Sequence, residues 1–99
     1  MVIEQKEEGL SALLEGELGH HEALSALRSL EDAISQQSPS RMELDFSGVS
    51  FMDSSGIAVL LRAYRRLGEL GGAVKVVHVP AQAGKVLRAA GLDKLMEFE

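Results

Sequence analysis

The residues with the clearest chemical potential are Asp53, Ser54, Ser55 and Gly56, which lie between an apolar strand-like run and the strongest helical pattern of the chain. This segment should form a helix N-terminus, where the Asp53 carboxylate can accept hydrogen bonds from first-turn N–H groups. A helix N-terminus also accommodates an anion. Phosphorylation of a serine there would add a charge of roughly −1.5 to −2 beside Asp53 and would expel a docked partner. The segment is therefore either a plain helix start or a phosphorylation switch.

The histidines are the next residues that could do chemistry. His20 and His21 are adjacent, and adjacent side chains do not converge on one helix face, so a metal site would need further ligands. His78 falls inside the valine-rich run 73–79, where we expect an exposed strand residue. A hydrolase built on Ser54 would need a Gly-x-Ser-x-Gly elbow, and the sequence has none. We therefore predict no metal, no cofactor and no enzymatic activity.

The composition disfavours several classes of function. The 99 residues hold 10 Lys and Arg against 15 Asp and Glu, a formal net charge of −5, which argues against nucleic-acid binding. The absence of Cys rules out disulfides, thiolate metal sites and cysteine nucleophiles. We find neither an export signal nor an apolar run approaching the roughly 18 residues of a membrane span. We expect one domain, residues 1–99, in the cytoplasm and without membrane insertion.

Apolar periodicity predicts the elements that position the candidate residues. The expected strands lie at residues 2–3, 10–14, 42–46, 49–52, 73–79 and 96–99. The expected helices lie at residues 24–34, 57–67 and 81–90. Gly9 should lie in a hairpin turn between the first two strands, and Gly91 should end the third helix in a left-handed conformation. Strands that alternate with helices imply an α/β domain, in which a small mixed sheet packs against amphipathic helices.

The run Phe51-Met52-Asp53-Ser54-Ser55-Gly56-Ile57 resembles the phosphoacceptor motif of STAS domains, specifically of the bacterial anti-sigma factor antagonists. The resemblance covers nearly the whole chain in register. It includes Gly16-Glu17-Leu18 with His20-His21, Leu44-Asp45-Phe46-Ser47-Gly48-Val49, Gly71-Gly72 and Ala90-Gly91-Leu92. The resemblance implies a single STAS domain that binds other proteins.

In that family the Ser directly after the Asp is phosphorylated by a serine kinase that is itself the anti-sigma factor. The resemblance therefore places the acceptor at Ser54, with Ser55 as the neighbouring second choice. It implies that the unphosphorylated form binds the kinase and releases a sigma factor, that phosphorylation ends this binding, and that a metal-dependent serine phosphatase resets the protein. The partner-binding residues that it implies are Met52, Asp53, Ser54, Ser55, Gly56, Gly19, His20 and His21.

Two positions depart from the family pattern. Gly19 stands where the family usually has Asp after Gly-Glu-Leu, and Glu22 replaces a hydroxyl-bearing residue at the helix start. The missing carboxylate would lie near the phosphoacceptor loop, so it bears on phosphorylation and partner binding and not on the fold. An alternative function is a constitutive scaffold, a STAS subunit docked on a transporter ATPase, which Gly19 favours and the intact run 53–56 opposes. The sequence allows a monomer or a weak dimer.

Overall fold

The structure, a computed structural model, describes residues 1–7 and 9–99. Its strands are β1 Val2–Lys6, β2 Gly9–Leu18, β3 Arg41–Met52, β4 Ala73–Val77 and β5 Glu97–Phe98. Its helices are α1 His20–Gln37, α2 Ser55–Glu69 and α3 Ala81–Ala89, followed by the 3-10 turn η1 Leu92–Lys94. The five strands of the described residues form one sheet in chain order, β1-β2-β3-β4-β5. None of the helices in this part of the chain is long and apolar enough to cross a membrane.

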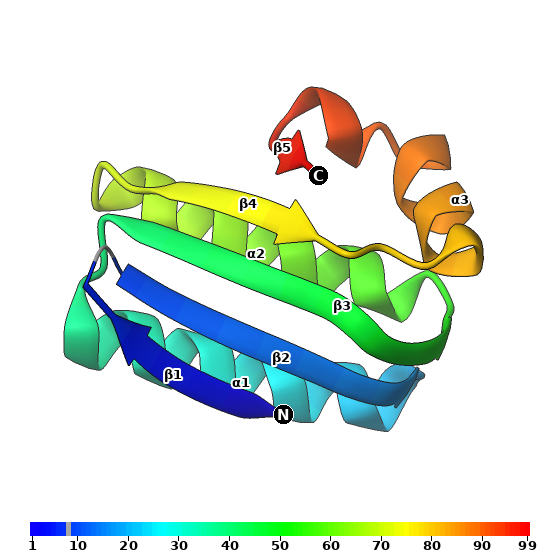
Figure 1. The fold of residues 1–99 in the computed structure, drawn as a ribbon, viewed down its shortest axis with the longest axis horizontal. Helices are drawn as coiled ribbons and strands as arrows, with labels where there is room; N and C mark the ends of the chain where they lie inside the picture. The colour runs from blue at the N-terminus through cyan, green and yellow to red at the C-terminus, as the bar shows by residue number, and fades with distance from the viewer. Residues whose placement is uncertain (8) are drawn as a thin grey trace.

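The sheet is mixed. β1 and β2 form an antiparallel hairpin, and β2, β3, β4 and β5 are parallel neighbours. Parallel neighbours need a crossover connection, which α1, α2 and α3 provide. The carboxyl ends of β2, β3 and β4 therefore lie at the same edge of the sheet, on the right in Figure 1. The predicted α/β class and the mixed sheet are confirmed.

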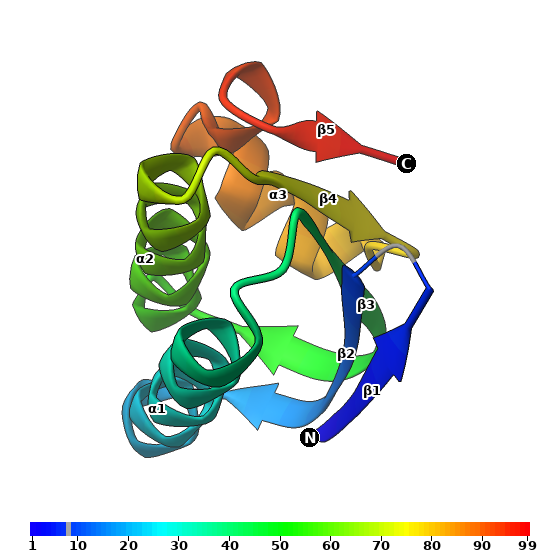
Figure 2. The same ribbon diagram turned by 90° about the vertical axis from the view of Figure 1, so that its left-hand side faces the viewer.

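The core lies between the sheet and the helices α1 and α2, which stand side by side on one face of the sheet (Figure 2). Met42, Leu44 and Phe46 of β3 are buried because alternate strand residues point to the same face. Burying a large apolar side chain completely contributes about 1.5–3 kcal/mol. The largest fully buried side chains are Phe46, Leu14, Leu30, Ile34, Met42, Leu44, Met52, Leu60, Leu67, Leu87, Leu92 and Val59.

β3 is longer than the sequence pattern predicts. The expected break at Ser47-Gly48 is wrong, because β2 pairs with β3 through this region and Gly48 lies opposite Glu15. The pairing shifts register between Leu13 and Glu15, which is the irregularity that interrupts the apolar alternation. Gly48 is required there, since an added Cβ would lie 2.9 Å from the Leu14 carbonyl oxygen.

β4 is shorter than predicted. The strand ends at Val77, and His78 adopts a left-handed backbone conformation with φ +55°, so the placement of His78 inside a strand is wrong. His78 is exposed, as expected, and its Nδ1 lies 3.3 Å from Asp45 Oδ2. The remaining helices and strands follow the prediction within three residues, except that α1 begins at His20 instead of 24 and β2 ends at Leu18 instead of 14. The placement of Gly9 in the hairpin turn is also wrong, because Gly9 begins β2 and pairs with Lys6. Gly91 has the expected left-handed conformation, with φ +78°.

Candidate functional site

Three helix starts meet at the carboxyl edge of the sheet. Leu18, the last residue of β2, pairs with Met52, the last residue of β3, so the starts of α1 and α2 follow neighbouring strand ends. The start of α3 joins them because the side chain of Gln82 is hydrogen-bonded to the backbone of Met52. Helix N-termini carry a partial positive charge, so the potential at this edge favours anions.

The segment 53–56 forms the start of α2. Asp53 Oδ1 accepts a hydrogen bond of 2.8 Å from the backbone N–H of Ser55. Ser54 precedes the helix, and its carbonyl accepts from the N–H of Ile57 at 3.1 Å. The expected role of the Asp53 carboxylate as an acceptor for a first-turn N–H is confirmed. The N-cap position itself belongs to Ser54, whose side chain makes no hydrogen bond to the helix.

The candidate residues differ in exposure. Ser54 is exposed, whereas Asp53 and Ser55 are half-buried. Met52 is fully buried, and Gly56 is buried directly above it, where an added Cβ would collide with the Met52 thioether. Ser54 is thus the member of this segment whose side chain is presented to solvent. Met52 and Gly56 support the segment from below and do not offer side chains to a partner.

Gly19, His20 and His21 lie at the neighbouring helix start. Gly19 precedes α1 in an ordinary extended conformation, with φ −82° and no side-chain hydrogen bond to the helix. An added Cβ there would lie 3.4 Å from Glu22 Oε1, which is an ordinary contact. His20 and His21 are exposed, with ring centroids 5.7 Å apart. Within residues 1–7 and 9–99, no group of three or more Asp, Glu or His side chains could hold a metal ion.

Asp45 and His78 lie in contact where the pairing of β3 with β4 ends, with His78 Nδ1 3.3 Å from Asp45 Oδ2. Asp45 is opposite Val77 in the register, and its Oδ1 accepts from the backbone N–H of Ser47 at 2.9 Å. Burial acts to raise the pKa of Asp45, but the hydrogen bonds from Ser47 and the neighbouring His78 outweigh it and hold the pKa below its ordinary value. The contact lies at the point where β4 turns away from β3.

Sequence reasoning missed Gln82. Its Oε1 accepts from the backbone N–H of Met52 at 2.8 Å, and its Nε2 donates to the Met52 carbonyl at 2.7 Å. The sequence signal was weak, because Gln is an ordinary polar residue in the first turn of an exposed helix. Only the tertiary contact between α3 and the end of β3 shows its partner.

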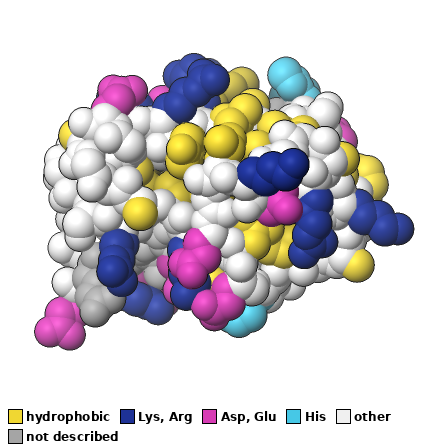
Figure 3. All heavy atoms as spheres, turned by 90° about the horizontal axis from the view of Figure 1, so that it is seen from above, with side chains coloured by type: hydrophobic (Ala, Val, Ile, Leu, Met, Phe, Trp, Pro, Cys, Tyr) yellow, Lys and Arg dark blue, Asp and Glu magenta, His cyan; other side chains and the backbone are white. Residues whose placement is uncertain are grey.

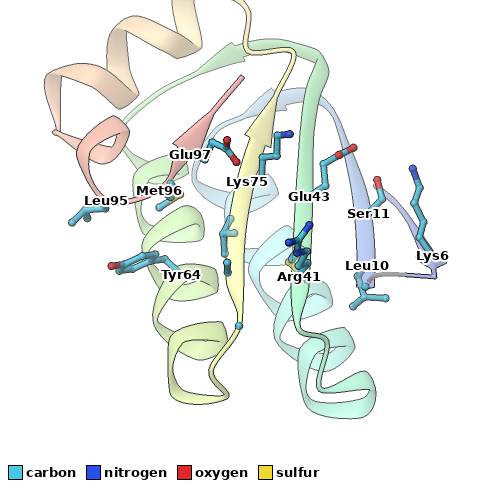
Figure 4. A pocket seen from close by; sticks show the side chains of 15 residues that line it. Lys6, Leu10, Ser11, Arg41, Glu43, Tyr64, Lys75, Leu95, Met96 and Glu97 are labelled. Carbon is cyan, nitrogen blue, oxygen red and sulfur yellow. The ribbon is translucent and has the colours of Figure 1, made fainter.

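A well-formed hollow in the described surface lies elsewhere. It has a volume of about 550 Å³ and is lined mainly at the amino ends of β3 and β4, including Arg41, Ala73, Tyr64 and Leu95 (Figure 4). Its rim carries side chains of both signs, among them Lys75 and Glu97, which gives no preference for an anion or a cation. It shares no residue with the segment 52–56.

Comparison with known proteins identifies the family. Residues 3–97 match the family described as Mlab, STAS domain. The chain belongs to the STAS domain family. An anti-sigma F factor antagonist from Paenibacillus polymyxa is 32% identical to this STAS domain over 83 residues, which are 84% of this chain and 71% of the relative. An anti-sigma F factor antagonist from Lysinibacillus sphaericus is 31% identical over 81 residues, 82% of this chain and 69% of the relative.

Solved structures agree with this assignment. The anti-sigma factor antagonist SpoIIAA in its unphosphorylated form superposes with a TM-score of 0.86 at 27% identity, covering 99% of this STAS domain and 86% of that chain. The Bacillus cell fate determinant SpoIIAA in the phosphorylated form superposes with a TM-score of 0.77 at 28% identity, covering 99% and 89%. The resemblance to the STAS family, and to its anti-sigma factor antagonists, is confirmed.

Proposed function

We propose that this STAS domain is an anti-sigma factor antagonist that binds an anti-sigma factor serine kinase and releases a sigma factor until Ser54 is phosphorylated. The observation that carries the proposal is the exposed Ser54 between Asp53 and Ser55 at the start of α2. The proposal is supported by the two relatives from Paenibacillus polymyxa and Lysinibacillus sphaericus, which are anti-sigma F factor antagonists. The protein then works in the cytoplasm, as one domain of residues 1–99, and as a monomer or weak dimer.

The docking face is the carboxyl edge of the sheet. Its polar part consists of Asp53, Ser54 and Ser55 together with Gly19, His20 and His21, while Met52 and Gly56 hold it from below. Phe51 adds an apolar anchor, because it is 46% exposed and immediately precedes this segment. Leu24, which is 43% exposed on α1 one turn after His20, adds a second. Exposed aromatic and aliphatic anchors beside polar groups are the usual composition of a protein-binding surface.

Phosphorylation of Ser54 transfers a group from ATP bound to the kinase. The Ser54 Oγ forms a bond to the γ-phosphorus as the bond to the β–γ bridging oxygen breaks, ADP leaves, and the hydroxyl proton passes to a base of the kinase. The α2 N-terminus accommodates the phosphate within this chain. A kinase surface that excludes water does not accommodate the phosphate, because the phosphate adds a charge of roughly −1.5 to −2 next to Asp53.

A small loss of binding free energy is enough to separate the protein from the kinase. A loss of about 1.4 kcal/mol weakens binding tenfold, so one desolvated phosphate is sufficient to separate the partners. A metal-dependent serine phosphatase then restores the free hydroxyl. Ser55 is the second-choice acceptor, because it is half-buried and its N–H is already bonded to Asp53.

The test is a pull-down from native cell extract with ATP, with wild type, Ser54→Ala, Ser54→Asp and Ser55→Ala as baits. We expect Ser54→Ala to retain an ATP-binding serine kinase and Ser54→Asp to lose it, and we expect Ser55→Ala to behave like wild type, which releases the kinase as Ser54 becomes phosphorylated. Mass spectrometry of the wild-type bait should locate the phosphate on Ser54. If Ser54→Asp retains the kinase as tightly as Ser54→Ala, the proposal is wrong.

A constitutive scaffold is the second candidate function. It is favoured by Gly19, which leaves α1 without a side-chain cap and without the carboxylate that family members carry at this edge. In that case all four baits would hold the same transporter ATPase, and the state of Ser54 would not matter.

A further inference from the structure

The end of β3 extends beyond the reach of β4. β3 pairs with β2 as far as Met52, whereas its pairing with β4 covers Arg41 to Asp45 among the described residues. β4 ends at Val77, and the left-handed conformation of His78 directs the chain away. The β4 side of Met52 therefore has backbone N–H and C=O groups that need another partner, because buried backbone groups are costly to leave without hydrogen bonds.

Gln82 provides that partner. Its carboxamide accepts from the Met52 N–H at 2.8 Å and donates to the Met52 carbonyl at 2.7 Å, as a neighbouring strand would. Among uncharged side chains, only those of Asn and Gln combine a carbonyl acceptor with an NH₂ donor in this way. Gln82 is the second residue of α3, so its backbone is held by the helix. The hydrogen bonds thus connect α3 directly to the residue that precedes Asp53 and Ser54.

Met52 is held from three directions. Leu18 pairs with it from β2, Gln82 bonds it from α3, and its buried side chain lies under Gly56 of α2. Ser54 follows two residues later and has no side-chain hydrogen bond to the helix that it precedes. The place of the Ser54 hydroxyl is therefore set mainly by the backbone that leads to it. Small displacements of a reacting group have large effects on rate, about a hundredfold for 1 Å.

We propose that Gln82 is a positioning residue for the phosphorylation of Ser54: its two hydrogen bonds to Met52 hold the backbone that presents the hydroxyl to the kinase-bound ATP. The inference rests on the proposed function. It adds a residue from a third helix, remote in sequence, to the phosphoacceptor site. Gln82 acts through Met52 and does not touch the reacting atoms.

Two variants separate positioning from stability. Gln82→Met keeps the length of the side chain and removes both hydrogen bonds. Gln82→Glu keeps an acceptor but places a second oxygen against the Met52 carbonyl, while a carboxylate in the first turn of α3 favours that helix. Global stability should therefore be preserved best in Gln82→Glu. Gln36→Met, at an exposed position in the last turn of α1 at the far edge of the sheet, is the matched control.

The measurement follows phosphate on Ser54 by mass spectrometry in native cell extract with ATP, over a range of concentrations of each variant. We expect the maximal rate to fall about tenfold in both Gln82 variants, with little change in the concentration that gives half-maximal rate. Amide hydrogen exchange, read without any kinase, should be faster at Met52 in Gln82→Met than in wild type. Gln36→Met should match wild type in both measurements.

The outcomes distinguish this inference from the function on which it rests. If wild type gains phosphate on Ser54 and the Gln82 variants gain it with unchanged rates, Gln82 is not a positioning residue, and the proposed function stands. Unchanged exchange at Met52 in Gln82→Met leads to the same conclusion. If wild type gains no phosphate on Ser54, the proposed function fails, and the role of Gln82 in phosphorylation fails with it.

Discussion

Asp53 and Ser55 are joined by a hydrogen bond of 2.8 Å, in which the Asp53 carboxylate accepts from the Ser55 backbone N–H. Ser54 lies between them and is exposed. The bond fixes both neighbours of the candidate phosphoacceptor. It also uses one lone pair of the carboxylate that would face a phosphate on Ser54. The same contact thus serves the start of α2 and the proposed switch.

Replacement of Asp53 should destabilise the protein. Asp53→Ala removes the acceptor for the Ser55 N–H, and losses of this kind at helix starts cost about 0.5–2 kcal/mol. Urea unfolding at neutral pH measures the free energy of unfolding. Asp53→Asn keeps an acceptor oxygen and should lose less. Equal losses for Asn and Ala would show that charge, and not the hydrogen bond, stabilises this turn.

Gly56 should not tolerate a methyl group. A Cβ at Gly56 collides with the buried Met52 side chain, so Gly56→Ala should cost about 1–3 kcal/mol in the free energy of unfolding. Gly68 in the same helix is the matched control, because nothing lies within 4 Å of an added Cβ there. Gly68→Ala should stabilise the protein by about 0.5–1 kcal/mol through helix propensity. Thermal unfolding of the two variants compares them, and a stable Gly56→Ala would contradict the close packing.

An Asp at position 19, the residue usual in the family, should raise the rate at which Ser54 is phosphorylated. Gly19 has an ordinary backbone conformation and room for a side chain, so Gly19→Asp should fold normally and gain a few tenths of a kcal/mol as a cap of α1. We expect faster phosphorylation of Ser54 in extract with ATP. Gly19→Asn supplies the cap without the charge and serves as control. Slower phosphorylation of Gly19→Asp would contradict this expectation and would favour the scaffold function, in which Gly19 contributes to binding of the partner.

Asp45 should make the protein sensitive to acid. Its pKa is lower in the folded protein than the ordinary value of 3.8, because the bonds from Ser47 and His78 outweigh burial. The resulting stabilisation is fully present above the ordinary pKa and is lost as the pH falls through the lower folded value. Asp45→Asn should flatten the loss of unfolding free energy between about pH 5 and about pH 2.

Exposed hydrophobic side chains outside the proposed docking face give a test of how far that face extends. The face that carries α3 and η1 shows hydrophobic side chains among Lys and Arg side chains (Figure 3). Leu95 of this region is 47% exposed. Leu95→Lys should leave the pull-down of the kinase unchanged, since the docking face lies at the start of α2. Loss of the kinase from Leu95→Lys would extend the docking face to η1.

Local pattern was sufficient for much of the fold. The apolar spacing from Ile57 to Leu67 placed α2 within two residues of its bounds, and Gly91 was identified as a left-handed helix end. These features depend on side-chain periodicity and on the conformational freedom of glycine, which act between neighbouring residues. The segment 53–56 was found for the same reason, because capping chemistry is local.

The sequence by itself therefore determined the order of the elements, the family and the candidate phosphoacceptor Ser54. Only the tertiary structure decided that β3 continues through Gly48, that His78 leaves the sheet to meet Asp45, and that Gln82 holds Met52. Each of these depends on a hydrogen bond or ion pair between residues far apart in the chain. The free energy of such a contact depends on where the rest of the chain places the second partner, and local periodicity carries no information about that place.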